Sequence, residues 1–317
     1  MMNYYFSYES SSKTEKNGLE RLTFVENVYF CLHITKRITE NDSNMKSMRM
    51  ILALVVMTLA AVSCGPRPKV LVVYYTQSSN TKTVAQEIAT RLNADLAEIV
   101  PVVPYDGDFQ ATVERGKKEL DEKSYPEIQP LAVDVANYDV VFLGYPIWFG
   151  TYAPPIFTWL DQVDLSGKKV VPFCTFGSGG LESSVMDLAK AEPKAEILSG
   201  YGVRAARLEA VPKEVDQFLK AGGFIEGEYA KLEEFPEQHP VSEEESAIFD
   251  AAVDGYPMIH AKATTVASRN IPEGTEYLFT AVDLPREEKA DMPPAHEIKV
   301  YVNVIGEETP VFTKVIR

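Results

Sequence analysis

The sequence predicts an α/β protein, with a doubly wound, five-stranded parallel sheet followed by a smaller α+β domain. From Lys69 onward, short apolar runs alternate with amphipathic segments of helical period. Runs such as residues 70–73 and 140–143 are apolar throughout, which is typical of strands covered on both faces. Five consecutive strand–helix units favour a doubly wound parallel sheet with right-handed crossovers.

The elements of this first domain can be assigned in order. Strands are expected at residues 69–75, 95–100, 139–145, 169–176 and 196–203. Helices are expected at residues 81–92, 110–122, 154–162, 181–191 and 213–221. Ligands of such sheets bind beyond the carboxyl ends of the strands. Three strand-end loops have an unusual composition, and we expect all three at that edge.

The first loop is rich in hydroxyl groups and leads directly into a helix. Its candidate ligand-binding residues are Thr76, Gln77, Ser78, Ser79, Asn80 and Thr81. A helix N-terminus supplies unpaired N–H groups and the positive end of the helix dipole, so the segment predicts a phosphate site. It lacks the glycine spacing of nucleoside-triphosphate and dinucleotide loops. Helix capping alone is the alternative reading of these hydroxyls.

The second and third loops differ from the first in character. Residues 144–152 carry four aromatic side chains, which would leave apolar surface exposed unless a flat ligand or another element covers it. Residues 175–180 contain three glycines, which allow backbone N–H groups to approach a ligand closely. Together, the three loops fit a phosphorylated planar ring system.

These motifs are YTQSSNT at residues 75–81, GYPIWFG at 144–150 and CTFGSGGLESS at 174–184. On them, residues 69–223 resemble a flavodoxin domain, which implies strand order 2-1-3-4-5 and an FMN cofactor. The resemblance implies that the first loop holds the phosphate and that Trp148 stacks on the isoalloxazine. The implied FMN-binding residues are Thr76, Gln77, Ser78, Ser79, Asn80, Thr81, Pro146, Ile147, Trp148, Phe149, Gly150, Thr175, Phe176, Gly177, Ser178 and Gly179. The family usually has glycine where Ser79 stands.

Two functions remain open for an FMN-binding domain. One is an electron carrier that docks to a redox partner protein; the other is an FMN-dependent NAD(P)H:quinone-type reductase with a small-molecule acceptor. The absence of a second dinucleotide fingerprint favours the carrier. The formal net charge of −15 argues against nucleic-acid binding, and the scattered cysteines and histidines predict no metal site. We assign no catalytic residue.

The N-terminal segment has the pattern of an export signal. Residues 48–63 join a basic start to an apolar run that is too short to span a bilayer comfortably. The sequence LAAVSC at residues 59–64 resembles a bacterial lipobox, which implies lipidation of Cys64, a tether at 64–68 and a place in the cell envelope facing the periplasm or exterior. Residues 1–47 are then interpreted as an extension upstream of the true start.

The C-terminal part changes in composition. Residues 224–241 are rich in glutamate and proline and are interpreted as an acidic linker. Ser242 opens a capping box, and strands are expected at residues 258–267, 276–283, 297–305 and 310–316. A helix across a four-stranded antiparallel meander resembles the cystatin fold over residues 242–317, with the motif VASRNIPEGTEYLF at 266–279. Since the family's hairpin glutamine is absent, a non-inhibitory binding or spacer module is favoured over a protease inhibitor. A non-redox binding function for the whole protein is the remaining alternative.

Overall fold

The computed structural model describes residues 68–106, 108–284 and 296–317. Pro68–Arg317 forms one compact unit. The predicted signal peptide, lipidated Cys64, tether and upstream extension fall in residues 1–67 and almost wholly outside the described part of the chain. No helix of the described residues is long and apolar enough to cross a membrane, and those residues hold no cluster of potential metal ligands.

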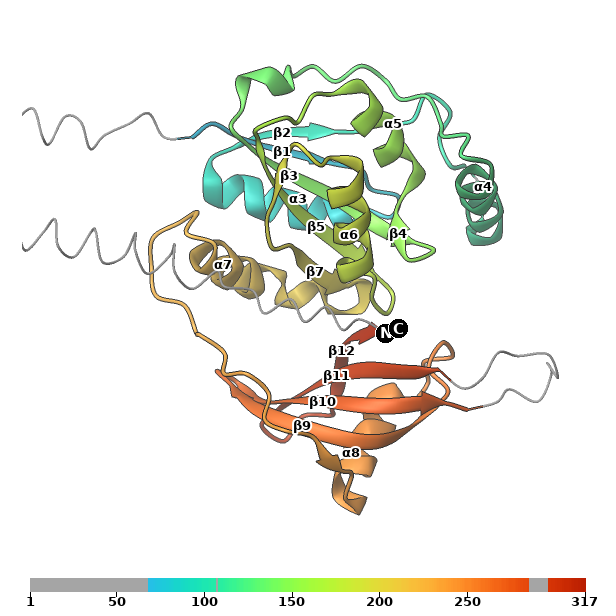
Figure 1. Cartoon of the computed structure of the whole chain (residues 1–317), viewed down its shortest axis with the longest axis vertical. Coiled ribbons are helices and arrows are strands. Elements are labelled where there is room, and N and C mark those ends of the chain that lie inside the picture. Colours follow the sequence, from blue (N-terminus) through green and yellow to red (C-terminus); the bar gives the residue numbers. More distant parts are fainter. Residues whose placement is uncertain (1–67, 107, 285–295) are drawn as a thin grey trace, which may run out of the picture. The chain divides into compact units, whose positions relative to one another are not determined.

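The first domain is built on a parallel sheet (Figure 1). Its main strands are β1 (Val70–Tyr74), β2 (Asp95–Glu98), β3 (Val140–Trp148) and β5 (Lys169–Phe176), and the order is β2-β1-β3-β5. Two short strands, β6 (Glu196–Ile197) and β7 (Tyr201–Arg204), both pair with β5 in parallel. The doubly wound parallel sheet predicted from the sequence is therefore confirmed.

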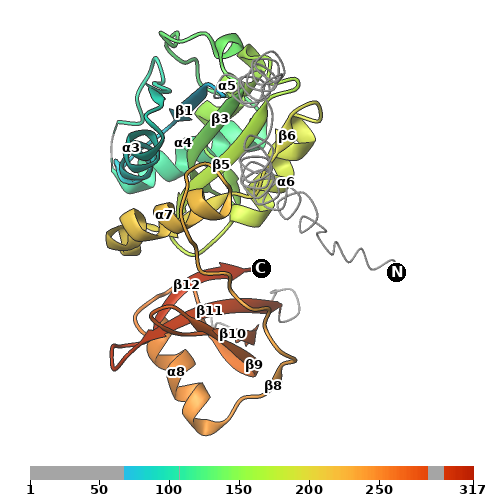
Figure 2. The same ribbon diagram turned by 90° about the vertical axis from the view of Figure 1, so that its left-hand side faces the viewer.

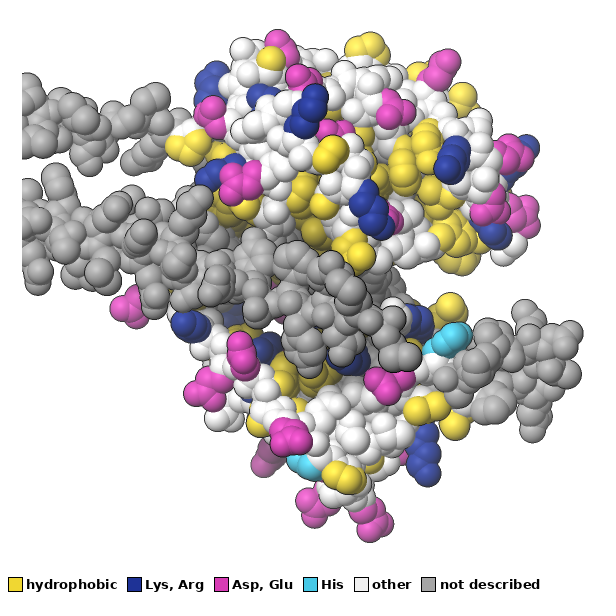
Figure 3. All heavy atoms as spheres, in the orientation of Figure 1, with side chains coloured by type: hydrophobic (Ala, Val, Ile, Leu, Met, Phe, Trp, Pro, Cys, Tyr) yellow, Lys and Arg dark blue, Asp and Glu magenta, His cyan; other side chains and the backbone are white. Residues whose placement is uncertain are grey.

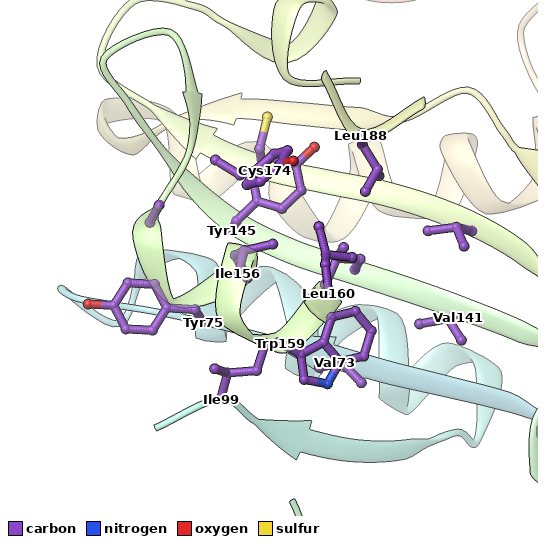
Figure 4. Close-up of a cluster of buried hydrophobic side chains, with 14 of the residues drawn as sticks. Val73, Tyr75, Ile99, Val141, Tyr145, Ile156, Trp159, Leu160, Cys174 and Leu188 are labelled. Atoms are coloured by element: carbon purple, nitrogen blue, oxygen red, sulfur yellow. The ribbon is translucent and has the colours of Figure 1, made fainter. Parts of the chain in front are cut away.

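Helices cover both faces of this sheet (Figures 1 and 2). Apolar side chains of α3 (Asn80–Leu92) and α7 (Val211–Ala221) pack on one face, and those of α5 (Pro154–Gln162) and α6 (Leu181–Ala191) pack on the other. Figure 4 shows the second cluster, in which Trp159 and Tyr145 are almost fully buried. The near-continuous apolar strands follow from this double coverage. The remaining helix, α4 (Phe109–Glu122), has only Gly116 fully buried.

Two predicted elements differ in detail from the structure. The fifth strand, expected at residues 196–203, is divided into β6 and β7 by one extra residue relative to β5. Pro172 lies in β5 at this point and has no N–H group to donate, which explains why the pairing is interrupted there. The second loop, expected from Gly144 onward, is mostly strand: β3 continues to Trp148 and forms a hairpin with β4 (Thr151–Tyr152).

The C-terminal domain is a helix on an antiparallel sheet. Helix α8 (Glu243–Val253) begins at a complete capping box made by Ser242 and Glu245. The sheet has the order β12-β11-β10-β9-β8. Its strands are β8 (His239–Pro240), β9 (Ala261–Ile271), β10 (Gly274–Asp283), β11 (Glu297–Ile305) and β12 (Val311–Ile316). Phe249 of α8 packs edge-on against Phe279 of β10 in the domain core.

Candidate functional site

The three unusual loops meet at the carboxyl edge of the parallel sheet. The buried hydroxyls of Thr81 and Thr175 are 2.8 Å apart and join the first loop to the third. Ser183 donates a 2.5 Å hydrogen bond to the carbonyl of Gly150, which ties the second loop to α6. A Cβ at Gly180 would lie only 2.6 Å from a methyl carbon of Ile147, so the second and third loops are also in close contact.

The first loop ends at a helix whose N-terminus has no side-chain cap. Ser79 is the N-cap of α3, with φ 64° and ψ −1°, and its side chain forms no capping hydrogen bond. The hydroxyl oxygen of Thr76 is buried and has no hydrogen-bond partner among the described residues. An uncapped helix N-terminus beside a buried, unpaired hydroxyl fits an anionic ligand that would complete the hydrogen bonds of both.

The other predicted residues of the first loop differ from Thr76 in their exposure and in their hydrogen-bond partners. Gln77 is held by Tyr75, whose hydroxyl donates to it (2.7 Å), and it donates to the carbonyl of Tyr105 (3.0 Å). Ser78 is exposed and Asn80 is half-buried at the start of α3. The side chain of Thr81 is 1% exposed, and its hydroxyl is engaged by Thr175. The Thr81 hydroxyl thus links the first and third loops, and its backbone N–H lies in the first turn of α3, where a phosphate could be bound.

The second loop is a two-residue β-hairpin. Phe149 and Gly150 both have positive φ (52° and 85°), as a type I′ turn requires. Glycine or asparagine is usual at such positions, so Phe149 is held in an unfavourable backbone conformation. Its side chain is nevertheless 54% exposed. Figure 3 shows hydrophobic side chains gathered over the part of the surface that includes β4 and α4.

Trp148 lies under α4 rather than in the open. A Cβ at Gly116 of α4 would lie 2.9 Å from the Trp148 ring. Tyr75 and Tyr105 contact the same indole edge-on, with ring centroids at 6.0 and 5.1 Å. Arg115 in turn lies over the Tyr105 ring at 3.9 Å. The tryptophan expected to stack on a ligand is thus half-buried in an aromatic cluster.

One site residue was missed by the sequence analysis. Thr151 begins β4, and its hydroxyl oxygen is buried without a hydrogen-bond partner among the described residues, like that of Thr76. The signal available in the sequence was a hydroxyl residue directly after the aromatic segment. Of the other predicted residues, Pro146 and Ile147 lie in β3, where they are half-buried, and Phe176 is buried at the end of β5.

Three titratable side chains near the loops, those of Tyr75, Tyr105 and Cys174, have pKa values raised above their usual ranges. Burial, more than any neighbouring charge, raises the pKa of Tyr75 and of Tyr105, and a hydrogen bond to Glu119 raises that of Tyr105 further. These hydroxyls are hydrogen-bond donors at neutral pH and not bases. Burial also raises the pKa of Cys174 well above its usual value. Nothing in this set points to proton transfer by the protein.

The buried thiol gives a first prediction. We expect iodoacetamide to leave Cys174 unmodified in the native protein at pH 8, because the reactive thiolate is disfavoured and the side chain is inaccessible. Above its raised pKa the thiolate would form, so the alkylation rate increases only at strongly alkaline pH. Peptide mapping by mass spectrometry, with urea-unfolded protein as the positive control, checks this. Rapid modification of native Cys174 at pH 8 would contradict it.

The positive φ of Ser79 gives a second prediction. Ser79→Gly should stabilise the protein by about 0.5–1 kcal/mol, because glycine adopts the left-handed region without strain. Ser78→Gly is the matched control, since Ser78 does not have a positive φ. This variant should lower the free energy of unfolding by about 0.5–1 kcal/mol, because glycine raises the entropy of the unfolded chain. Urea unfolding of both variants measures the difference. Equal destabilisation by the two glycines would mean that Ser79 is unstrained.

Comparison with known proteins identifies the family of the first domain. The flavodoxin family model matches residues 69–215. A candidate flavoprotein of Bacteroides eggerthii is 30% identical; the match covers 97% of that protein and 47% of this chain, with a TM-score of 0.42. Residues 69–215 belong to the flavodoxin family.

Two further relatives extend the comparison of the flavodoxin domain. A Lactobacillus acidophilus flavoprotein, solved in complex with FMN, is 28% identical over 97% of its own chain and 47% of this one, with a TM-score of 0.41. An uncharacterised protein of Methanocaldococcus jannaschii is 29% identical over 116 residues. The matched segment spans 36% of this chain and 59% of that relative.

Proposed function

We propose that the flavodoxin domain binds FMN at its three loops and that the protein transfers electrons. The observation that carries this proposal is a pair of buried hydroxyls that have no hydrogen-bond partner among the described residues: that of Thr76, in the loop that leads to the uncapped N-terminus of α3, and that of Thr151, in the hairpin after β3. Buried polar groups are almost always hydrogen-bonded in native proteins, so two such groups at one edge suggest a polar ligand. The domain's family and an FMN-bound relative support the choice of flavin.

In this proposal, each loop has a separate part. Thr76 and the first N–H groups of α3 bind the phosphate, where the helix dipole favours negative charge. Phe149 offers an exposed ring for the isoalloxazine, and we assign stacking to this residue. The Trp148 ring packs against Gly116 of α4, and we assign it a structural role in the hairpin. The third loop supplies backbone donors. Bound FMN would supply the electron-transfer chemistry, and the protein would set its affinity and accessibility.

A comparison of two flavins tests the phosphate assignment. The full chain should bind FMN at least about a hundredfold more tightly than riboflavin, because riboflavin has no phosphate to fill the α3 N-terminus. Quenching of flavin fluorescence measures both dissociation constants. Equal affinities for the two flavins would contradict a phosphate site at Thr76 and Ser79.

We favour an electron carrier over a reductase. The support is that the sequence shows no second dinucleotide-binding fingerprint, which a nicotinamide site of that kind would need. Mixing the FMN-loaded protein with NADH or NADPH without oxygen separates the two. A carrier keeps its flavin absorbance for minutes, whereas prompt bleaching would establish the alternative FMN-dependent reductase.

We also propose that the protein is lipid-anchored through Cys64 and works in the bacterial cell envelope, on the strength of the lipobox-like sequence at residues 59–64. The C-terminal domain would then be a cystatin-like binding or spacer module. Intact-mass analysis of the membrane fraction tests the anchor: a diacylglycerol adduct on a chain that begins at Cys64 is expected. A mature chain that retains Tyr4 and Tyr5 would contradict it.

A further inference from the structure

The third loop contacts the C-terminal domain through its backbone. The Nε of Arg204 donates to the carbonyl of Gly177 (2.9 Å), and the N–H of Val315 in β12 donates to the carbonyl of Ser178 (2.7 Å). Strand β12 is the edge of its sheet, so its outward N–H groups are available for bonds beyond the ladder. The Ser178 carbonyl thus accepts from the C-terminal domain itself, and the Gly177 carbonyl accepts from Arg204, the last residue of β7 in the first domain.

Arg204 joins the two domains directly. It is 7% exposed, and its Nη1 donates to the carbonyl of Phe312 (2.9 Å) while its guanidinium lies 3.4 Å from the centroid of the Phe312 ring. The described residues record no carboxylate partner for it; its hydrogen bonds go to two carbonyls, one from each domain. Burial without a carboxylate lowers its pKa somewhat. A planar guanidinium can bridge two acceptors in this way, and a lysine cannot do so while stacking on a ring.

Gly179 shows how closely β12 approaches the loop. A Cβ at this position would lie 2.0 Å from the carbonyl oxygen of Val315, a distance that no side chain can accommodate without moving the backbone. Gly179 has no positive φ, so its backbone conformation does not require glycine. Glycine is needed here because of the contact with β12. The third loop is thus fitted to the C-terminal domain.

The carbonyl contacts fix where the N–H groups of the loop point. All described peptide bonds are trans, so the N–H of Ser178 points opposite to the carbonyl of Gly177, and the N–H of Gly179 opposite to that of Ser178. No hydrogen bond recorded for the described residues is donated by either N–H. The N–H of Ser178 therefore points away from Arg204, and the N–H of Gly179 points away from the backbone of Val315.

We propose that the C-terminal domain is a structural part of the flavin site: β12 and Arg204 hold the third loop so that the N–H groups of Ser178 and Gly179 are presented to the polar edge of the isoalloxazine. This inference rests on the proposed FMN binding. Because the same loop serves both contacts, docking of the C-terminal domain and flavin binding strengthen each other. The domain is thereby given a role that its own fold does not suggest.

Three variants of the full chain test this inference. Val315→Pro removes the β12 donor, Arg204→Met removes both arginine hydrogen bonds, and Lys314→Met is the matched control on the same strand. Lys314 pairs with Glu182 of α6 (2.6 Å), so this control removes a partly exposed ion pair of the same domain contact, which contributes little, and leaves the loop carbonyls untouched. The first two variants should each weaken FMN binding about tenfold, within the usual range for coupled sites, and the control less than about twofold. Circular dichroism verifies that each variant is folded.

Hydrogen exchange of the flavin-free protein separates this inference from the proposed function. Faster exchange at residues 174–184 in Val315→Pro and Arg204→Met, but not in Lys314→Met, is expected. If the wild type binds FMN and both variants retain its affinity, the inference is overturned. If the wild type binds no FMN, the proposed function and this inference both fall, even where the exchange result shows that the docking itself is real. An equal loss of affinity in Lys314→Met would also overturn it, because the loop carbonyls would not be the cause.

Discussion

Thr76→Val is expected to make the flavin-free protein more stable and its FMN binding weaker. The Thr76 hydroxyl is buried and has no partner in the described part of the chain, and an unsatisfied buried polar group costs about 1–3 kcal/mol. Valine has nearly the same shape and no such group, so we expect a gain of about 1 kcal/mol in urea unfolding. If the hydroxyl binds the phosphate, its loss removes a hydrogen bond to a charged group. Such a bond contributes about 1.5–3 kcal/mol, so FMN affinity should fall roughly ten- to hundredfold.

Thr81→Val is the control for this prediction. Its hydroxyl already has a partner, Thr175, so the substitution should lower stability by about 1–2 kcal/mol because the Thr175 hydroxyl is left unpaired. The effect on FMN affinity should be smaller than that of Thr76→Val. If Thr76→Val lowers stability as Thr81→Val does and leaves FMN affinity unchanged, the Thr76 hydroxyl has no ligand role.

Trp148→Ala and Phe149→Ala should have opposite signatures. Trp148 packs between Tyr75, Tyr105 and Gly116, so its truncation should cost about 2–4 kcal/mol of stability, somewhat less than for a fully buried tryptophan. Phe149 is largely exposed at the hairpin turn, so its truncation should change stability by less than about 0.5 kcal/mol. If Phe149 stacks on the flavin, Phe149→Ala should weaken FMN binding about tenfold. Aromatic stacking contributes about 0.5–1.5 kcal/mol in addition to the free energy gained by burying apolar surface.

Phe149→Gly separates strain from stacking. Glycine relieves the positive φ and removes the ring, so this variant should be slightly more stable than the wild type while binding FMN as weakly as Phe149→Ala. Urea unfolding and fluorescence titration of the three variants give both quantities. Loss of FMN affinity in Trp148→Ala alone, with Phe149→Ala unchanged, would return the stacking role to Trp148.

The sequence predicts the sheet well because its strands are covered on both faces. Uninterrupted apolar runs such as those of β1 and β3 are typical of that environment, and the alternating helices leave few topologies. The same periodic reasoning could not anticipate the division of the fifth strand, which depends on the pairing of one extra residue opposite Pro172 in β5. Local periodicity predicts where a strand lies, but it does not determine the register between strands that are distant in the chain.

The candidate site was predictable at the level of loops but not of atoms. The hydroxyl residues of the first loop look alike in sequence, yet Thr81 is engaged by Thr175, 94 positions away, while Thr76 finds no partner within residues 68–106, 108–284 and 296–317. The aromatic segment reads as an irregular loop because Phe149 stands where a type I′ turn normally has asparagine or glycine. Local sequence could not show that α4 covers Trp148, because that helix comes from more than 25 residues earlier in the chain.

The visible absorption spectrum of the purified full chain, recorded before and after addition of FMN, tests the central claim most directly. We predict saturable, one-to-one uptake of FMN, with a shifted flavin absorption band and quenched flavin fluorescence, and with much weaker uptake by Thr76→Val. A folded protein that leaves the spectrum and fluorescence of added FMN unchanged would contradict the claim that the three loops form a flavin site.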